Sequence, residues 1–143
     1  MALELYMIGL NVQDMGTSLE FYRLLGVEFP AESEGKTHVE VKMGELTFFL
    51  DSRPNRWDPD FAWSDNPARL EASAYYPTLL EFYLKTSEAV KAKYAELIAA
   101  GHCSHRAPYE TRFGMCFAMI KDPDGNVVLL SGDLEKNQAT PAG

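Results

Sequence analysis

The sequence predicts an α+β fold in which two βαβββ modules form a curved mixed sheet around a shared trough. Residues 5–26 and 77–101 are two weak copies of one pattern, each an apolar strand, a polar turn and a helix that ends at a glycine. Setting Leu10 on Phe82 gives an offset of 72 residues (82 − 10), and the same offset aligns the two helices. Several strand-like segments follow each copy. A repeat of this size indicates two similar halves, which usually form their site where they meet.

The first half begins with an apolar strand at residues 3–12. Asp14 is a suitable N-cap for a helix that ends near Leu25, and Gly26 is a suitable stop. The other strands of this half are expected around Glu28, at residues 38–42, which alternate between apolar and polar side chains, and at residues 46–51.

The second half repeats this order. Thr86 or Ser87 can cap a helix that runs to Ala100, and Gly101 ends it. The strands of this half are expected at residues 79–85, 104–110, 114–121 and 127–131, with a tight turn at residues 122–125.

The 143 residues fit a single domain, 1–143, with modules 1–51 and 78–133 joined by a long loop at residues 52–77. This loop contains four prolines, which exclude long regular elements, and it is rich in aromatic residues, Trp57 and Trp63 among them. A disordered linker is usually poor in aromatic residues. The loop is therefore expected to pack on a ligand, on a second subunit or on its own domain.

The composition excludes some classes of protein. A net charge of −8 argues against nucleic-acid binding, which requires a basic face, and it would suit a cationic ligand if the acidic residues line a cleft. No apolar run approaches the roughly 20 residues of a membrane-spanning helix, and the N-terminus does not resemble a secretory signal. Two cysteines without a signal peptide favour a reduced, cytoplasmic protein, and neither cysteine lies in a CxxC spacing.

Two motifs carry a resemblance to a known family. MIGLNVQDMGTSLEFYRLLGVEF lies near the start of the chain, and IKDPDGNVVLLSG lies near its end. Together with the repeat, they make residues 4–132 resemble the vicinal oxygen chelate superfamily, which includes glyoxalase I, extradiol dioxygenases and bleomycin-resistance proteins. In its metal-using members, a His, Gln or Glu on the first and last strand of each half binds one divalent ion in the trough.

The resemblance assigns those four ligand positions to Met7, Phe48, Leu79 and Leu129. The first and third lie five residues before Val12 and its repeat partner, and the others lie four residues past a hairpin glycine. None of the four is a ligand for Zn²⁺, Mg²⁺ or Fe²⁺, which require imidazole, carboxylate or thiolate donors. The sequence therefore predicts a site without metal and without cofactor.

The trough is then expected to have an apolar floor that suits an aromatic or apolar ligand. Strand alternation groups Asn11 with Met7 and groups Glu81 and Tyr83 with Leu79. Glu81 is a candidate anchor for a cation, and the resemblance places the loop before residue 114 near the mouth of the trough. The candidate ligand-binding residues are Met7, Asn11, Phe48, Trp57, Trp63, Leu79, Glu81, Tyr83, Tyr109, Arg112, Phe113 and Leu129.

Simpler interpretations remain open. The apolar residues at the four positions can fill the trough as core, and Glu81 can be a surface residue. His38 could act as an acid or base, although a His in an alternating strand more often faces solvent. His102 and His105 flank Cys103 without a further donor nearby, which does not favour a metal site.

Three functions follow. The first is a metal-independent small-molecule binder of the bleomycin-resistance type, which sequesters an aromatic or cationic compound as a homodimer. The second is a lyase, isomerase or dioxygenase of the same superfamily, dependent on a metal or using Glu81, His38 or Tyr83. The third is an interaction domain with a filled trough.

Overall fold

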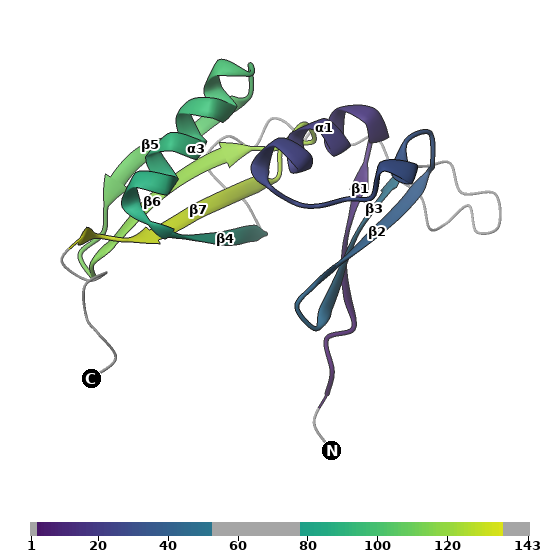
Figure 1. Ribbon diagram of the computed structural model, residues 1–143, viewed down its shortest axis with the longest axis horizontal. Coiled ribbons are helices and arrows are strands. Elements are labelled where there is room, and N and C mark those ends of the chain that lie inside the picture. Colours follow the sequence, from purple (N-terminus) through teal and green to yellow (C-terminus); the bar gives the residue numbers. More distant parts are fainter. Residues whose placement is uncertain (1–2, 53–77, 136–143) are drawn as a thin grey trace. The chain divides into compact units, whose positions relative to one another are not determined.

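The structure is a computed structural model that describes residues 3–52 and 78–135. The chain divides into two compact units, Met1–Pro67 and Ala68–Gly143. Each unit holds a mixed sheet and one α-helix among its described residues (Figure 1). The α+β class built from two repeated modules is therefore confirmed, and the shared trough stays a prediction.

The sheet of the first unit contains β1 (Met7–Val12), β2 (His38–Met43) and β3 (Leu46–Ser52) in the order β1-β3-β2. β1 runs parallel to the central strand β3, and β2 runs antiparallel to it. The helix α1 (Met15–Leu25) connects β1 to the short 3-10 helix η1 (Ala31–Ser33), which precedes β2.

Both ends of α1 form as the sequence predicts. The Asp14 carboxylate accepts a hydrogen bond from the backbone N–H of Thr17 at 2.9 Å, which satisfies one free donor of the first turn. Gly26 ends the helix with a φ of 125°, which a residue with a side chain rarely adopts, and its N–H donates to the carbonyls of Tyr22 and Arg23.

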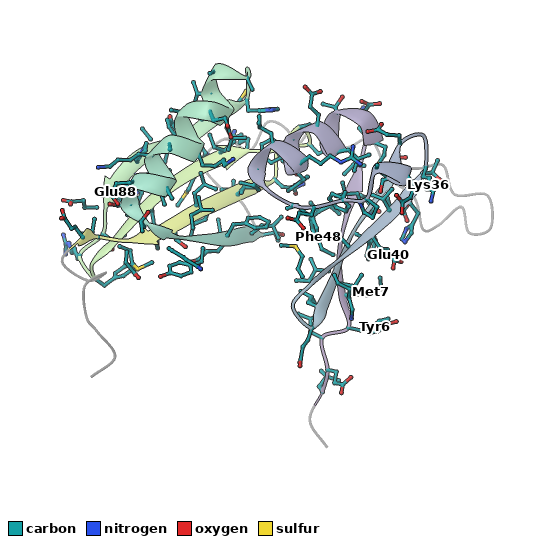
Figure 2. The ribbon with its side chains drawn as sticks, in the orientation of Figure 1. Tyr6, Met7, Lys36, Glu40, Phe48 and Glu88 are labelled. Carbon is teal, nitrogen blue, oxygen red and sulfur yellow. The ribbon has the colours of Figure 1, made fainter. Side chains whose placement is uncertain are left out.

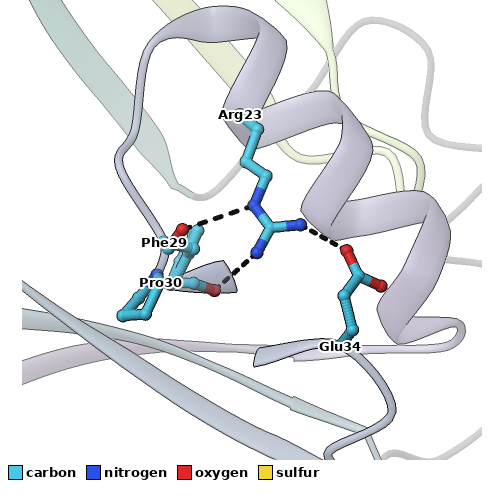
Figure 3. A network of polar contacts seen from close by, with 4 residues as sticks. All are labelled: Arg23, Phe29, Pro30 and Glu34. Atoms are coloured by element: carbon cyan, nitrogen blue, oxygen red, sulfur yellow. Dashed lines mark hydrogen bonds and ion pairs between the residues drawn. The ribbon is translucent and has the colours of Figure 1, made fainter. Parts of the chain in front are cut away.

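The strand expected around Glu28 does not form. Val27 and Phe29 are buried without strand pairing, and the Arg23 guanidinium binds the backbone that a strand would need. Its Nε donates to the carbonyl of Phe29 at 3.4 Å and its Nη2 to that of Pro30 at 2.6 Å, while Nη1 forms an ion pair with Glu34 (Figure 3). Because these carbonyls point at Arg23 and Pro30 has no N–H, the segment cannot join a ladder.

The second unit has the full βαβββ order. β4 (Leu79–Thr86) leads into α3 (Ser87–Ala99), followed by β5 (Cys103–Glu110), β6 (Met115–Lys121) and β7 (Val127–Asp133). The sheet order is β4-β7-β6-β5, in which β4 is parallel to β7 and the other pairs are antiparallel. Figure 1 shows α3 across one face of this sheet.

The predicted turn before β7 is confirmed and is held by one buried side chain. The Asp122 carboxylate accepts from the backbone N–H of Asp124 at 2.9 Å and from that of Asn126 at 2.8 Å. It also accepts from the side-chain amide of Asn126, and Gly125 takes the φ of 86° that the turn requires. This turn fixes the register of β6 against β7.

Neither helix in residues 3–52 and 78–135 is long and apolar enough to cross a lipid bilayer.

Lys85, at the junction of β4 and α3, is strained. It has a φ of 74°, alone among the non-glycine residues of the described ranges, and it sits where the pairing of β4 with β7 shifts register. We expect Lys85→Gly to raise the free energy of unfolding by about 0.5–1 kcal/mol, because glycine adopts this conformation without strain. Urea denaturation of the full chain measures the change.

Gln13 is the matched control, since it lies 72 residues earlier (85 − 13) in the first copy of the repeat and has no positive φ. Gln13→Gly should lower stability, because glycine adds entropy to the unfolded chain without relieving strain. A loss of stability in Lys85→Gly as large as that in Gln13→Gly would contradict the expectation.

Candidate ligand-binding site

The candidate site is the face of the four-stranded sheet that points away from α3, here called the α3-distal face. A Cβ built on Gly132 would lie 3.0 Å from Cγ2 of Val90, so Gly132 faces α3. Side chains alternate along a strand, so Leu129 and Ser131 of β7 face the other way. Their cross-strand neighbours on β4 and β6 share this face.

Strand pairing arranges two rows of side chains across this face. The first, here called the charged row, runs from β5 to β4 through Arg106, Met119, Leu129 and Glu81. The second, the aromatic row, lies beside it and contains Tyr109, Phe117, Ser131 and Tyr83. The predicted residues Leu79, Glu81, Tyr83 and Leu129 thus share one face, as the alternation of their strands indicates.

The middle of the charged row is apolar. Met119 and Leu129 form a buried cluster with Val127, and Phe117 packs against it. Leu129 is only 2% exposed, whereas Leu79 and Tyr83 on the edge strand β4 are 41% and 54% exposed. Leu129 is therefore part of a filled floor, and the accessible groups lie at the two ends of each row.

At the β4 end, two carboxylates accept hydrogen bonds from hydroxyl groups. Ser131 Oγ donates to Glu81 at 2.8 Å, and the hydroxyl of Tyr83 donates to Asp133 at 2.6 Å. The hydrogen bond to Asp133, with smaller contributions from desolvation and from the carboxylate charge, raises the pKa of Tyr83. Tyr83 therefore stays a neutral hydrogen-bond donor near pH 7.

At the β5 end, aromatic rings and a cation meet. The rings of Tyr109 and Phe113 pack edge-on against Phe117, with centroids 6.0 and 5.6 Å away. The guanidinium carbon of Arg106 lies 3.5 Å from the centre of the Tyr109 ring, a cation–π contact. Arg112 lies in the exposed turn after β5. Sequence reasoning missed Arg106, because two register shifts in β5 break the alternation that would have placed it.

In the first unit, the equivalent surface is the face of the sheet away from α1, the α1-distal face. It includes Met7 and Asn11 of β1, as predicted, and strand pairing adds Phe49 and Asp51 of β3. The ring of Phe49 lies across Gly9, where an added Cβ would come within 1.9 Å of it.

The expectation that Phe48 shares this face was wrong. Phe48 is 4% exposed and packs against Tyr22 of α1 and against Phe29, on the other face of the sheet (Figure 2). Met43 pairs with Leu46 across a two-residue turn, whereas the β6–β7 turn has five residues. Counting from the hairpin glycine therefore reaches opposite faces in the two units, and Phe49 occupies the position that Phe48 was expected to take.

His38 lies between two carboxylates on the α1-distal face. Its Nδ1 is 3.2 Å from Asp51, which is fully buried, and its Nε2 is 2.8 Å from Glu40. Protonation of both ring nitrogens would let each donate to its carboxylate, so the two contacts favour the imidazolium form of His38. Burial lowers the pKa of His38, but the hydrogen bonds and charges of Glu40 and Asp51 outweigh it, and the net effect raises the pKa.

The residues present do not fit a divalent metal ion. Within residues 3–52 and 78–135, no three His, Cys, Asp or Glu side chains converge as metal ligands would. Asp51 and Glu40 bind different nitrogens of the His38 ring and so approach it from different sides. On the two distal faces, Met7, Leu79, Leu129 and Phe49 carry no donor for a hard cation.

Two surface hollows lie elsewhere. One of about 410 Å³ adjoins the start of α1, between Asp14 and Lys36. The other, of about 490 Å³, adjoins the start of α3 and is lined by Ser87, Glu88, Lys91, Glu110, Leu134 and Glu135. Figure 2 labels Glu88. Both are lined mainly by charged and polar side chains, unlike the apolar sites that usually bind small molecules. Trp57 and Trp63 lie outside the described residues.

Two repeated α+β modules, each a mixed sheet with one α-helix among its described residues, define the class of protein. The sequence matches the model of the Glyoxalase/Bleomycin resistance protein/Dioxygenase superfamily over residues 5–130, and the chain belongs to this superfamily. A comparison with curated protein sequences gives no significant match.

Solved structures show the same fold at low sequence identity. A glyoxalase/bleomycin resistance protein/dioxygenase family enzyme from Burkholderia phytofirmans PsJN is 22% identical, with a TM-score of 0.71 over 92% of this chain and 100% of that one. A glyoxalase-related enzyme from Fulvimarina pelagi is 17% identical, with a TM-score of 0.71 over 92% and 89%. Lactoylglutathione lyase from Agrobacterium tumefaciens is 20% identical, with a TM-score of 0.60 over 95% and 96%.

Proposed function

We propose that this chain is a metal-independent small-molecule binding protein of the glyoxalase/bleomycin-resistance type, which holds an aromatic or cationic compound against the α3-distal face. The observation that carries the proposal is the charged row, in which two apolar side chains separate the polar groups Arg106 and Glu81. Apolar surface supplies affinity in such sites, and a few polar groups orient the ligand.

The alternative function, a lyase, isomerase or dioxygenase, has less support. The metal-dependent form lacks suitable ligands at the family positions. In the metal-free form, a base needs a free lone pair within reach of the substrate proton. Both nitrogens of His38 face carboxylates, and Tyr83 is held neutral by Asp133. Glu81 is a single carboxylate that already accepts from Ser131.

The proposal includes a homodimer and a cytoplasmic location. The free thiols of Cys103 and Cys116 support a reducing compartment, because an oxidising one favours disulfides. Family resemblance is the support for the homodimer. Analytical ultracentrifugation tests it directly, and a monomer at all concentrations would remove this part of the proposal.

Ligand binding without metal can be tested on protein dialysed against a chelator and checked by elemental analysis. We expect cationic aromatic compounds to raise the melting temperature of this metal-free protein. Glu81→Gln should weaken their binding by about tenfold, because a hydrogen bond to a charged group contributes about 1.5 kcal/mol.

Glu88→Gln is the matched control, since Glu88 lies at the start of α3 and outside the α3-distal face. It should leave binding unchanged. The proposal fails if no compound in the panel stabilises the protein, or if stabilisation requires a divalent ion.

A further inference from the structure

The charged row points to a particular class of ligand, and this inference rests on the proposed function. We infer that the ligand is an elongated amphoteric molecule, with an acidic group that binds Arg106, a basic group that binds Glu81 and an apolar middle that packs against the half-buried rings of Tyr109 and Phe117. The four residues of the charged row lie on four adjacent strands, so they form a straight line across the sheet.

The length of the row sets the length of the ligand. Neighbouring strands lie about 4.8 Å apart, so the three steps from β5 to β4 separate the backbones of Arg106 and Glu81 by roughly 14 Å. Both end residues are exposed, and both middle residues are buried. A ligand of about this length reaches both charges while its middle passes over the buried part of the row.

Arg106 is suited to an acidic group. Its guanidinium carbon lies 3.5 Å from the centre of the Tyr109 ring. A guanidinium that contacts a ring through its face keeps its N–H edge for a carboxylate, which it can bind through two parallel hydrogen bonds. Lys121, the neighbour of Met119 two residues along β6, adds positive charge near this end.

Glu81 is suited to a basic group. The buried hydroxyl of Ser131 donates to its Oε2, which fixes the orientation of the carboxylate. A carboxylate can accept about four hydrogen bonds, so an ammonium group can bind beside Ser131. Asp133, which accepts from Tyr83, adds negative charge at the same end of the sheet.

Aromatic side chains favour a ring in the middle of the ligand. The aromatic row places Tyr109, Phe117 and Tyr83 beside the charged row. Rings in an apolar site gain from edge-on contacts with neighbouring rings, in addition to the surface they bury. A planar aromatic middle would therefore meet the edges of these partly exposed rings, with the buried Met119 and Leu129 below them.

Four matched biphenyls test the inference on the full, chelator-treated chain by calorimetric titration. They are 4′-(aminomethyl)biphenyl-4-carboxylic acid, biphenyl-4-carboxylic acid, 4-(aminomethyl)biphenyl and biphenyl-4-methanol. The amphoteric compound should bind at least about tenfold more tightly than either singly charged compound. Glu81→Gln should abolish the gain from the amine and spare the acid, and Arg106→Gln should do the reverse. Both side chains are exposed, and circular dichroism checks that the variants fold.

The outcomes separate this inference from the proposed function. If the neutral alcohol binds as tightly as the amphoteric compound, the inference is wrong and metal-free binding stands. If the two variants weaken the binding of all four compounds equally, Arg106 and Glu81 do not bind the charged ends of the ligand, and the inference is again wrong. If none of the four binds, the inference is wrong, and the panel of cationic aromatic compounds decides the proposed function separately.

Discussion

Gly132→Val should lower the free energy of unfolding of the second unit by about 3 kcal/mol, the largest effect expected of any single change considered. A Cβ at Gly132 would lie 2.3 Å from the carbonyl oxygen of Thr86 and 3.0 Å from Cγ2 of Val90. The oxygen belongs to the backbone of the residue that caps α3, so it cannot move without disturbing the helix start. Overpacking of this kind typically costs about 1–3 kcal/mol, and a backbone clash belongs at the upper end.

Urea denaturation followed by circular dichroism measures this loss. Gly16→Ala is the control, because the nearest atom to its added Cβ is 3.8 Å away, an ordinary contact, and alanine favours the helix. It should leave stability unchanged or raise it. A Gly132→Val protein that matches the wild type would show that β7 does not pack against the start of α3 as described.

The second large effect is a pH-dependent loss of stability in His38→Gln. Because the pKa of His38 is raised in the folded state, its contribution is complete below the ordinary value of 6.5 and disappears as the pH rises through the folded value. At pH 5.5 we expect the variant to lose about 1 kcal/mol, since solvent screens ion pairs of a partly exposed side chain. This is less than the cost of breaking a fully buried ion pair, because the His38 side chain is 43% exposed.

Unfolding curves of wild type and variant between pH 5.5 and 8.5 measure this difference. The two stabilities should converge at high pH, and an NMR titration of the imidazole signals should assign to His38 a pKa above 6.5. Glu45→Gln, in the β2–β3 turn, is the control and should change neither result. A stability difference that stays constant over the whole pH range would contradict the charged state of His38.

The sequence predicted the parts of the fold that depend on neighbours along the chain. Asp14 and Thr86, separated by the repeat offset of 72 residues (86 − 14), both cap a helix by accepting from a backbone N–H three residues on. The Asp122 turn also formed as predicted. Capping and turn chemistry are local, so residue type and spacing are enough to predict them.

What the sequence missed depends on contacts between distant residues. No local signal around Glu28 shows that Arg23 will bind the carbonyls of Phe29 and Pro30. The face of Phe48 depended on the length of a hairpin turn, since a shift of one residue reverses every side chain of a strand.

The candidate site divides in the same way. Glu81 and Tyr83 could be grouped on one face from strand alternation alone, because β4 is regular up to Tyr83. Arg106 could not be assigned to this face, because the irregular pairing of β5 breaks the alternation of side chains along the strand. Asp51 was missed as the partner of His38, because strand pairing brings them together across 13 residues of sequence.

The most direct test of metal-free binding at the α3-distal face is a methyl NMR titration of the chelator-treated protein, labelled at its methionine methyl groups, with the amphoteric biphenyl. Met119 lies in the middle of the charged row, and Met15 is buried in the first unit and serves as the internal reference. The Met119 methyl signal is assigned by its loss in Met119→Leu. The proposal predicts that this signal shifts until the protein is saturated with ligand, without added metal, and that the Met15 methyl signal does not shift. A Met119 signal that does not move, or that moves only after a divalent ion is added, would contradict it.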